Sequence, residues 1–192
     1  MKLLLHVCCA PCLEYQFQVI KNENIEFEGY FYNPNIQPDW EYIRRKKTLE
    51  YFAEKNSFLV HYSKPSEDIS LFNILSFENM WKNFETEERC MNCYRIRLDR
   101  TAKFAVENGF DAFTSTLMGS IYQNFDLLCE IGNEISIKYN IQFYARDFRE
   151  GFRIGQTMAK EHGLYRQKYC GCICSLDESA LKGKILASVK RD

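Results

Sequence analysis

The 192-residue sequence has no long hydrophobic run and almost no net charge. Its N-terminal apolar stretch, residues 3–7, is interrupted by His6 and is shorter than the roughly 7–15 apolar residues of an export signal. No segment approaches the roughly 18 apolar residues of a membrane span. The net charge of −1 gives no overall basic field that would draw the chain to nucleic acid. We therefore expect a cytoplasmic protein with no membrane partner, in which any nucleic-acid contact depends on local basic patches.

The size and composition fit one compact domain. Hydrophobic residues make up 46% of the chain and aromatic residues 15%, which is enough to bury a substantial core. We expect a single α/β domain over residues 1–192. Within it, residues 64–88 are expected to form a helical insert or lid, and residues 162–192 a C-terminal segment.

Short apolar segments alternate with helix-like segments along the chain. The expected strands cover residues 2–7, 25–32, 58–62, 110–117 and 141–144. The expected helices cover residues 13–20, 39–55, 90–108, 125–139, 156–161 and 175–189. This alternation predicts a Rossmann-like parallel sheet with helices on both faces. Sites in such sheets lie at the carboxyl ends of the strands, so the loops after the first, second and fourth strands should meet there.

Nine cysteines are the most unusual feature of the composition. The cytosol keeps thiols reduced and the number is odd, so metal binding or redox chemistry is a better explanation than structural disulfides. The thiols form three groups and one isolated residue: Cys8, Cys9 and Cys12; Cys90 and Cys93; Cys170, Cys172 and Cys174; and Cys129. Cys129 follows a helical pattern and is expected to pack as a small hydrophobic residue. Cys174 is either an accessory thiol or a packing residue.

The spacing of the thiols favours an iron–sulfur cluster over a single zinc ion. A structural zinc site usually combines two C-x2-C pairs, and only Cys90 and Cys93 form one. Adjacent side chains are expected to diverge, which suits different corners of a polynuclear cluster. A [4Fe-4S] cluster takes four thiolates, often from distant segments, and we predict that two segments supply them: Cys8, Cys9, Cys90 and Cys93. In the alternative set Cys12 replaces Cys8 or Cys9, and a zinc site is a further alternative.

Three thiols are then left over, together with Glu14. Cys170 and Cys172 flank Gly171, which permits a tight turn. Two thiols so close could form a strained, easily reduced disulfide of the catalytic kind. Alternatively they join Cys12, with Glu14, in holding a second metal ion, such as a mononuclear iron acting as a Lewis acid. Both interpretations place a substrate-activating group beside an electron source.

Five segments carry a family resemblance: LLLHVCCAPC, YNPNIQPDWEYIRR, CMNCYRIRL, FTSTLMGSIYQN and YRQKYCGCICS. Together they resemble the cobalamin-independent epoxyqueuosine reductases, the QueH family, over nearly the whole chain. The resemblance implies a two-electron reduction of epoxyqueuosine to queuosine in tRNA, the last step of queuosine synthesis, with the epoxide oxygen lost as water. It implies a [4Fe-4S] cluster on the four predicted ligands, redox activity at Cys170 and Cys172, and no cobalamin.

The fold of this family resembles the ATP-pyrophosphatase (PP-loop) domains of tRNA-thiolating enzymes. Their phosphate loop follows the first strand, and HVCCAPC stands at that position here. No glycine-rich cradle for a nucleotide phosphate is present, so we expect that a metal site has replaced the ATP site and that ATP is not used. Two rival functions are a zinc-stabilised tRNA-binding module and a cluster-dependent tRNA thiolation enzyme.

The resemblance implies two partners, a tRNA with epoxyqueuosine in its anticodon and an external electron donor. Splayed bases are recognised by aromatic and cationic side chains. The candidate stacking residues are Tyr32, Trp40, Tyr122 and Tyr165. The candidate phosphate contacts are Arg44, Arg45, Arg95, Arg97, Arg153 and Arg166. His6 either donates a hydrogen bond to a cluster sulfur or is a satisfied core histidine, and Glu14 or a protonated thiol could polarise the epoxide oxygen.

Overall fold

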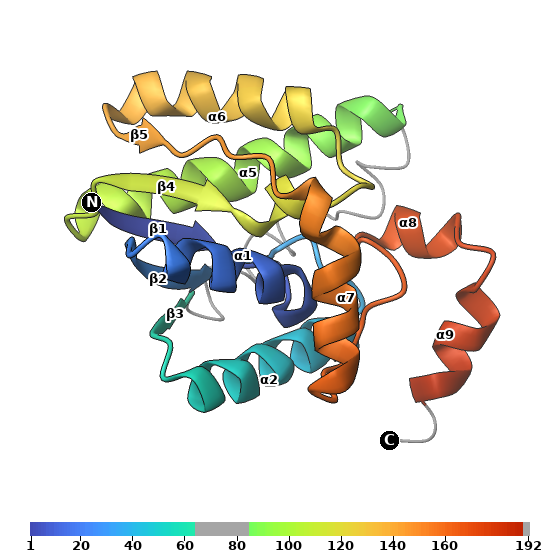
Figure 1. Ribbon diagram of the computed structural model, residues 1–192. Helices are drawn as coiled ribbons and strands as arrows, with labels where there is room; N and C mark the ends of the chain where they lie inside the picture. The colour runs from blue at the N-terminus through green and yellow to red at the C-terminus, as the bar shows by residue number, and fades with distance from the viewer. Residues whose placement is uncertain (64–84, 190–192) are drawn as a thin grey trace.

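The computed structural model describes residues 1–63 and 85–189, which form a five-stranded sheet covered by helices (Figure 1). All strand pairs are parallel, and the strand order is β3-β2-β1-β4-β5. The strands are β1 (Lys2–His6), β2 (Glu26–Phe31), β3 (Val60–Tyr62), β4 (Ala112–Ser115) and β5 (Gln142–Phe143). This arrangement confirms the predicted α/β class with a parallel sheet.

Helices cover both faces of the sheet, as predicted. In Figure 1, one face carries α1 (Ala10–Asn22), α2 (Asp39–Asn56) and α7 (Phe152–Glu161). The other face carries α5 (Thr86–Glu107) and α6 (Phe125–Tyr139). Each helix connects two parallel strands or follows the last one, which is the crossover arrangement that a parallel sheet requires. All loops after the strands therefore point to one edge.

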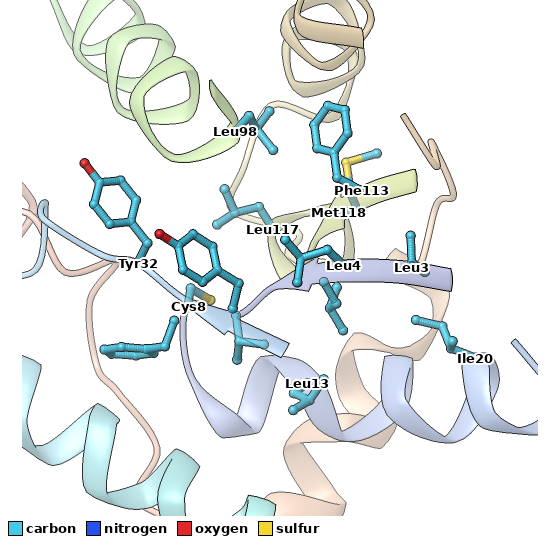
Figure 2. Packing of buried hydrophobic residues seen from close by; sticks show 14 of the residues in the cluster. Leu3, Leu4, Cys8, Leu13, Ile20, Tyr32, Leu98, Phe113, Leu117 and Met118 are labelled. Atoms are coloured by element: carbon cyan, nitrogen blue, oxygen red, sulfur yellow. The ribbon is translucent and has the colours of Figure 1, made fainter. Parts of the chain in front are cut away.

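The centre of the core is β1, which is buried on both faces. Leu3, Leu4 and Leu5 are completely buried. Figure 2 shows Leu13 and Ile20 of α1 on one side of this strand. A strand covered on both faces must be apolar at consecutive positions, so the sequence LLL at residues 3–5 marks the middle of the sheet.

Several element boundaries differ from the sequence prediction. The fourth strand ends at Ser115, whose side chain accepts a hydrogen bond from the Leu117 amide at 3.2 Å and starts a 3-10 turn, η1 (Thr116–Gly119). The last helix of the prediction, 175–189, is instead two helices, α8 (Ile173–Asp177) and α9 (Lys182–Val189). Between them, the Ser179 hydroxyl accepts a hydrogen bond from the Leu181 amide, which competes with helical pairing.

The predicted insert at 64–88 falls mainly on residues 64–84, which lie outside the described residues. Helix α5 begins at Thr86, so residues 86–88 form its first turn. The helix predicted at 156–161 begins four residues earlier, at Phe152. Within residues 1–63 and 85–189, no helix has the length and apolar character needed to cross a membrane.

Candidate metal and redox site

The loop between β1 and α1, together with the first turn of α1, places three sulfur atoms at the carboxyl edge of the sheet. The Cys8 amide donates to the Thr116 hydroxyl at 3.0 Å, which ties this loop to the end of β4. The sulfur atoms of Cys8, Cys9 and Cys12 all lie within 4.8 Å of one another. Cys8 and Cys9 are buried, and Cys12 is partly buried. Three thiols so close together form a group that could hold a metal ion.

The expected divergence of the Cys8 and Cys9 side chains is wrong. Their sulfur atoms lie 3.6 Å apart. Cys9 is the N-cap of α1 with extended backbone angles, φ −172° and ψ 157°, so the chain changes from strand to helix at this point. This change of direction brings the two side chains together. Cys8 and Cys9 are therefore close enough to bind the same metal ion.

Helix α5 supplies Cys90 and Cys93 from its N-terminal half. Both side chains are partly buried, and C-x2-C spacing places them about one helical turn apart. Arg97, one turn further on, donates from Nε to the Cys93 carbonyl at 3.0 Å and from Nη2 to the Cys93 sulfur at 3.1 Å. The sulfur of Cys93 therefore has a charged hydrogen-bond donor in direct contact.

The third group lies in the turn before α8, beyond the strand ends (Figure 1). The sulfur atoms of Cys170 and Cys172 are 3.6 Å apart, and none of the nine cysteines forms a disulfide. The hydrogen bond between the two thiols lowers the pKa of Cys170 to about 5 and raises the pKa of Cys172. These opposite shifts favour negative charge on Cys170 rather than on Cys172. Cys174 is buried against Cys93 and Cys172 and serves as a packing residue.

Packing joins the second and third cysteine groups, since Cys174 contacts both Cys93 and Cys172, and electrostatics place the first group near them. Burial lowers the pKa of Arg97, but negative charge on Cys93, Cys8 and Cys170 outweighs it, and the net pKa is raised. Because these three thiols come from the three separate segments, all of them lie near one guanidinium group. Figure 2 shows Cys8 just beyond the end of β1.

A buried network on α2 holds the Cys170 turn in place. Arg45 is 2% exposed and donates to the carbonyls of Tyr169 at 3.0 Å and Cys170 at 3.1 Å. Its Nε donates to Glu41 at 2.7 Å, and the second oxygen of Glu41 accepts a hydrogen bond from Tyr165 at 2.6 Å. This internal ion pair therefore helps to hold the turn that carries Cys170 and Cys172.

Gly171 is required in this turn for two reasons. Its φ of +121° lies in a region that favours glycine, and an added Cβ would lie 3.1 Å from Ile36 and 3.2 Å from Arg45. Gly171→Ala is expected to lower the free energy of unfolding by about 1–3 kcal/mol and to increase the alkylation rate of Cys172. Urea denaturation and mass-spectrometric labelling measure both effects.

Gly163→Ala is the matched control, since Gly163 has a φ of +67° but no atom within 4 Å of its added Cβ. It should cost only the backbone strain of about 1–2 kcal/mol and leave Cys172 labelling unchanged. A Gly171 variant no less stable than this control, with unchanged labelling, would contradict the account of the turn.

His6 is a satisfied core histidine. Its Nδ1 lies 2.8 Å from the Ser115 hydroxyl and its Nε2 lies 3.0 Å from the Tyr32 carbonyl oxygen. Burial, aided by the positive charge of Arg97, lowers the His6 pKa to about 4. The ring is therefore neutral near pH 7, and it joins the ends of β1, β2 and β4 beneath the cysteine loop.

The structure separates Glu14 from the three-sulfur group but leaves one of its oxygens without a partner. Glu14 is completely buried, and its Oε1 lies 2.7 Å from Nδ1 of His162. Its Oε2 has no hydrogen-bond partner among the described residues. Cys12, by contrast, belongs to the sulfur group and accepts a hydrogen bond from Gln167 at 3.3 Å.

Two of the predicted phosphate contacts are wrong. Arg45 and Arg97 are 2% and 4% exposed, so neither reaches a phosphate on the protein surface. Sequence reasoning also missed Thr116 and Gln167, which contact the sulfurs of Cys8 and Cys12. Helix spacing alone predicts that Arg97 lies on the same face of α5 as Cys93, because the two residues are four apart, but it does not predict that Arg97 is buried.

The predicted stacking residues differ in their exposure. Tyr122 is 78% exposed, and its ring packs edge-on against Phe152, which shares a small pocket with Cys12. Tyr32 is only 3% exposed, and its ring lies parallel to that of Tyr30. Trp40 and Tyr165 both lie near the Arg44 guanidinium group. Tyr122 is therefore the most accessible of the four.

Fold and site define a class: an α/β protein with a parallel sheet and a cysteine-rich group at its carboxyl edge that could bind a metal. Comparison with known proteins narrows the class. Residues 3–178 match the family model described as "Epoxyqueuosine reductase QueH", and the chain belongs to this family, as the sequence motifs predicted.

Curated relatives carry the same description. A protein from Thermotoga maritima is 36% identical over 181 residues, which cover 91% of this chain and 90% of the relative. One from Staphylococcus aureus is 34% identical over 90% of this chain and 74% of its own. One from Streptococcus pyogenes is 34% identical over 99% of this chain and 75% of its own. Each of the three is named epoxyqueuosine reductase QueH.

Proposed function

We propose that this protein is an epoxyqueuosine reductase, an oxidoreductase that converts epoxyqueuosine in a tRNA anticodon to queuosine. The reaction takes two electrons and two protons, breaks both C–O bonds of the epoxide, and yields a double bond and one water molecule. One observation carries the proposal. The family model matches residues 3–178, almost the whole chain, and this match includes the cysteine segments of the site.

We propose a [4Fe-4S] cluster as the resident cofactor, held by Cys8, Cys9, Cys90 and Cys93. The chemistry of the donor set supports the fit, since all four residues are free thiols, and two are buried. Arg97 adds a buried positive charge beside them, which suits an anionic thiolate-ligated group. When bound, such a cluster supplies electrons one at a time.

Cys170 and Cys172 are proposed as the second half of the redox site. Two thiols that become a disulfide release two electrons and two protons, which balances the loss of the epoxide oxygen as water. Their sulfurs, 3.6 Å apart, need to approach to about 2.05 Å to form the bond. The external electron donor then reduces the disulfide again.

The alternative role for this pair is to join Cys12 in holding a mononuclear iron. Cys12 supports this alternative through its place in the three-sulfur group, whereas Glu14 lies outside that group and pairs with His162. A single turnover with chemically reduced Cys172→Ser protein separates the two roles. Undiminished turnover would rule out obligatory dithiol chemistry.

We further propose that the tRNA anticodon enters at the carboxyl edge of the sheet, with a base stacked on Tyr122. The exposure of Tyr122 and its contact with Phe152 support this placement. We also propose that the cysteine loop after β1 stands where a PP-loop domain has its phosphate-binding loop. Neither ATP nor cobalamin then takes part in the reaction. A single domain with a C-terminal segment over residues 162–192 then carries the whole activity in the cytoplasm.

An anaerobic assay tests the reaction. The purified protein is incubated with tRNA that carries epoxyqueuosine and with a low-potential chemical reductant, and the nucleosides are then analysed by mass spectrometry. We expect queuosine to appear only when protein and reductant are both present. A protein that binds this tRNA tightly but leaves the epoxide unchanged would instead be a tRNA-binding module.

A further inference from the structure

Arg97 is a buried cation that forms no ion pair with a carboxylate of residues 1–63 or 85–189. It is 4% exposed. Among the ion pairs of the described residues, none includes Arg97. Arg45, the other buried arginine near the site, differs in this respect because it is paired with the fully buried Glu41 at 2.7 Å. Within the part of the chain that the structure describes, α5 therefore supplies the site with a buried positive charge that no carboxylate offsets.

The hydrogen bonds of Arg97 direct this charge at one sulfur atom. Nε donates to the carbonyl of Cys93 at 3.0 Å, and this bond fixes the plane of the guanidinium group. Nη2 then donates to the Cys93 sulfur at 3.1 Å. A guanidinium group keeps its charge at all relevant pH values, so this donor is permanently cationic.

An uncompensated cation in a protein interior is costly unless negative charge lies nearby. The hydrogen bonds that the Arg97 side chain donates to described residues both go to Cys93, to its carbonyl and its sulfur. Negative charge on a group bound at the Cys93 sulfur would therefore lie directly against the guanidinium group. Arg97 is placed to act as the counter-ion of such a group.

We propose that Arg97 is a positioning residue that raises the reduction potential of the thiolate-ligated group bound at Cys93. Adding an electron makes this group more negative, and a fixed cation hydrogen-bonded to a ligand sulfur stabilises the more negative state. This inference rests on the proposed function, because it requires a redox-active group on these thiols.

The test is a redox titration of the anaerobically reconstituted protein, followed by electron paramagnetic resonance. Arg97→Gln removes the charge, and we expect it to shift the reduction equilibrium at least tenfold toward the oxidised state, which for a one-electron couple is about 59 mV. Arg97→Lys keeps the charge but lacks the planar pair of donors. Its reduction potential should lie between those of Arg97→Gln and the wild-type protein.

Arg95 provides the matched control. It lies on the same helix, but its side chain is 44% exposed and pairs with Glu134 on the surface at 2.7 Å. Arg95→Gln removes the same charge from α5 and should leave the potential unchanged. An equal shift in both variants would mean that the effect comes from net charge, and it would overturn the proposal.

The inference is also overturned if Arg97→Gln holds a full complement of iron and has the wild-type reduction potential. In that case the proposed function still stands, provided that the wild-type protein forms queuosine. If Arg97→Gln fails to fold or to retain iron, Arg97→Lys decides, and an unchanged potential in that variant overturns the inference. A wild-type protein with no redox-active group overturns both the inference and the proposed cofactor.

Discussion

Replacing Cys9 with serine is expected to remove most of the bound iron and to reduce queuosine formation at least about 100-fold. Cys9 is 1% exposed and its sulfur lies in the three-sulfur group beside Cys8. Serine offers a harder, protonated oxygen in place of a thiolate, which iron–sulfur chemistry disfavours. Loss of a group that only supports a ligand typically costs about 10–100-fold, so loss of a ligand should cost more. Iron and sulfide analysis, followed by the anaerobic tRNA assay, measures both effects.

Cys129→Ser is the control for this variant. Cys129 is a partly buried thiol on α6 that packs against the hydrophobic core, outside the three-sulfur group. The Cys129→Ser variant should keep the iron content and the queuosine-forming activity of the wild-type protein. Cys12→Ser, tested in parallel, decides between the two ligand sets that the sequence left open. If Cys9→Ser retained its iron and turned over normally while Cys12→Ser did not, the proposed set would be wrong.

Replacing Arg45 with methionine is expected to lower the free energy of unfolding by about 3–5 kcal/mol, the usual cost of breaking a buried ion pair. Glu41 is completely buried, and the variant would remove the guanidinium group that pairs with it at 2.7 Å. The carbonyls of Tyr169 and Cys170 would also lose their donors. Urea denaturation under anaerobic conditions, followed by circular dichroism, measures the loss.

Two further variants show whether this loss comes from the buried charge. Arg95→Met breaks an exposed ion pair and should cost no more than about 1 kcal/mol. A double variant, Glu41→Leu with Arg45→Met, removes both charges and should recover much of the stability. If Arg45→Met were no less stable than Arg95→Met, the buried network would not be what holds the Cys170 turn.

The general fold was predictable because local patterns determine it. Three consecutive buried leucines mark a strand covered on both faces, and alternation with helical segments requires parallel pairing. The break between α8 and α9 was not predictable in the same way. It depends on one hydroxyl, that of Ser179, competing for a backbone amide, and the surrounding sequence is compatible with a continuous helix.

The site was predictable in its residue types but not in its geometry. Thiol spacing identified three cysteine segments, and the structure brings them to one edge of the sheet. The approach of the Cys8 and Cys9 sulfurs depends on a turn that spacing alone does not define. The roles of Arg45 and Arg97 were missed because a charged residue in a single sequence suggests a surface position, whereas burial depends on partners that only the tertiary structure supplies.

The central claim, that a thiol-bound iron–sulfur group at this site performs the reduction, is tested most directly by graded reconstitution. Protein samples with increasing iron and sulfide content are assayed anaerobically for queuosine formed per molecule of protein in the first turnover. The account predicts that queuosine increases in proportion to cluster content and vanishes in iron-free protein. Equal turnover by an iron-free, zinc-loaded sample would contradict it.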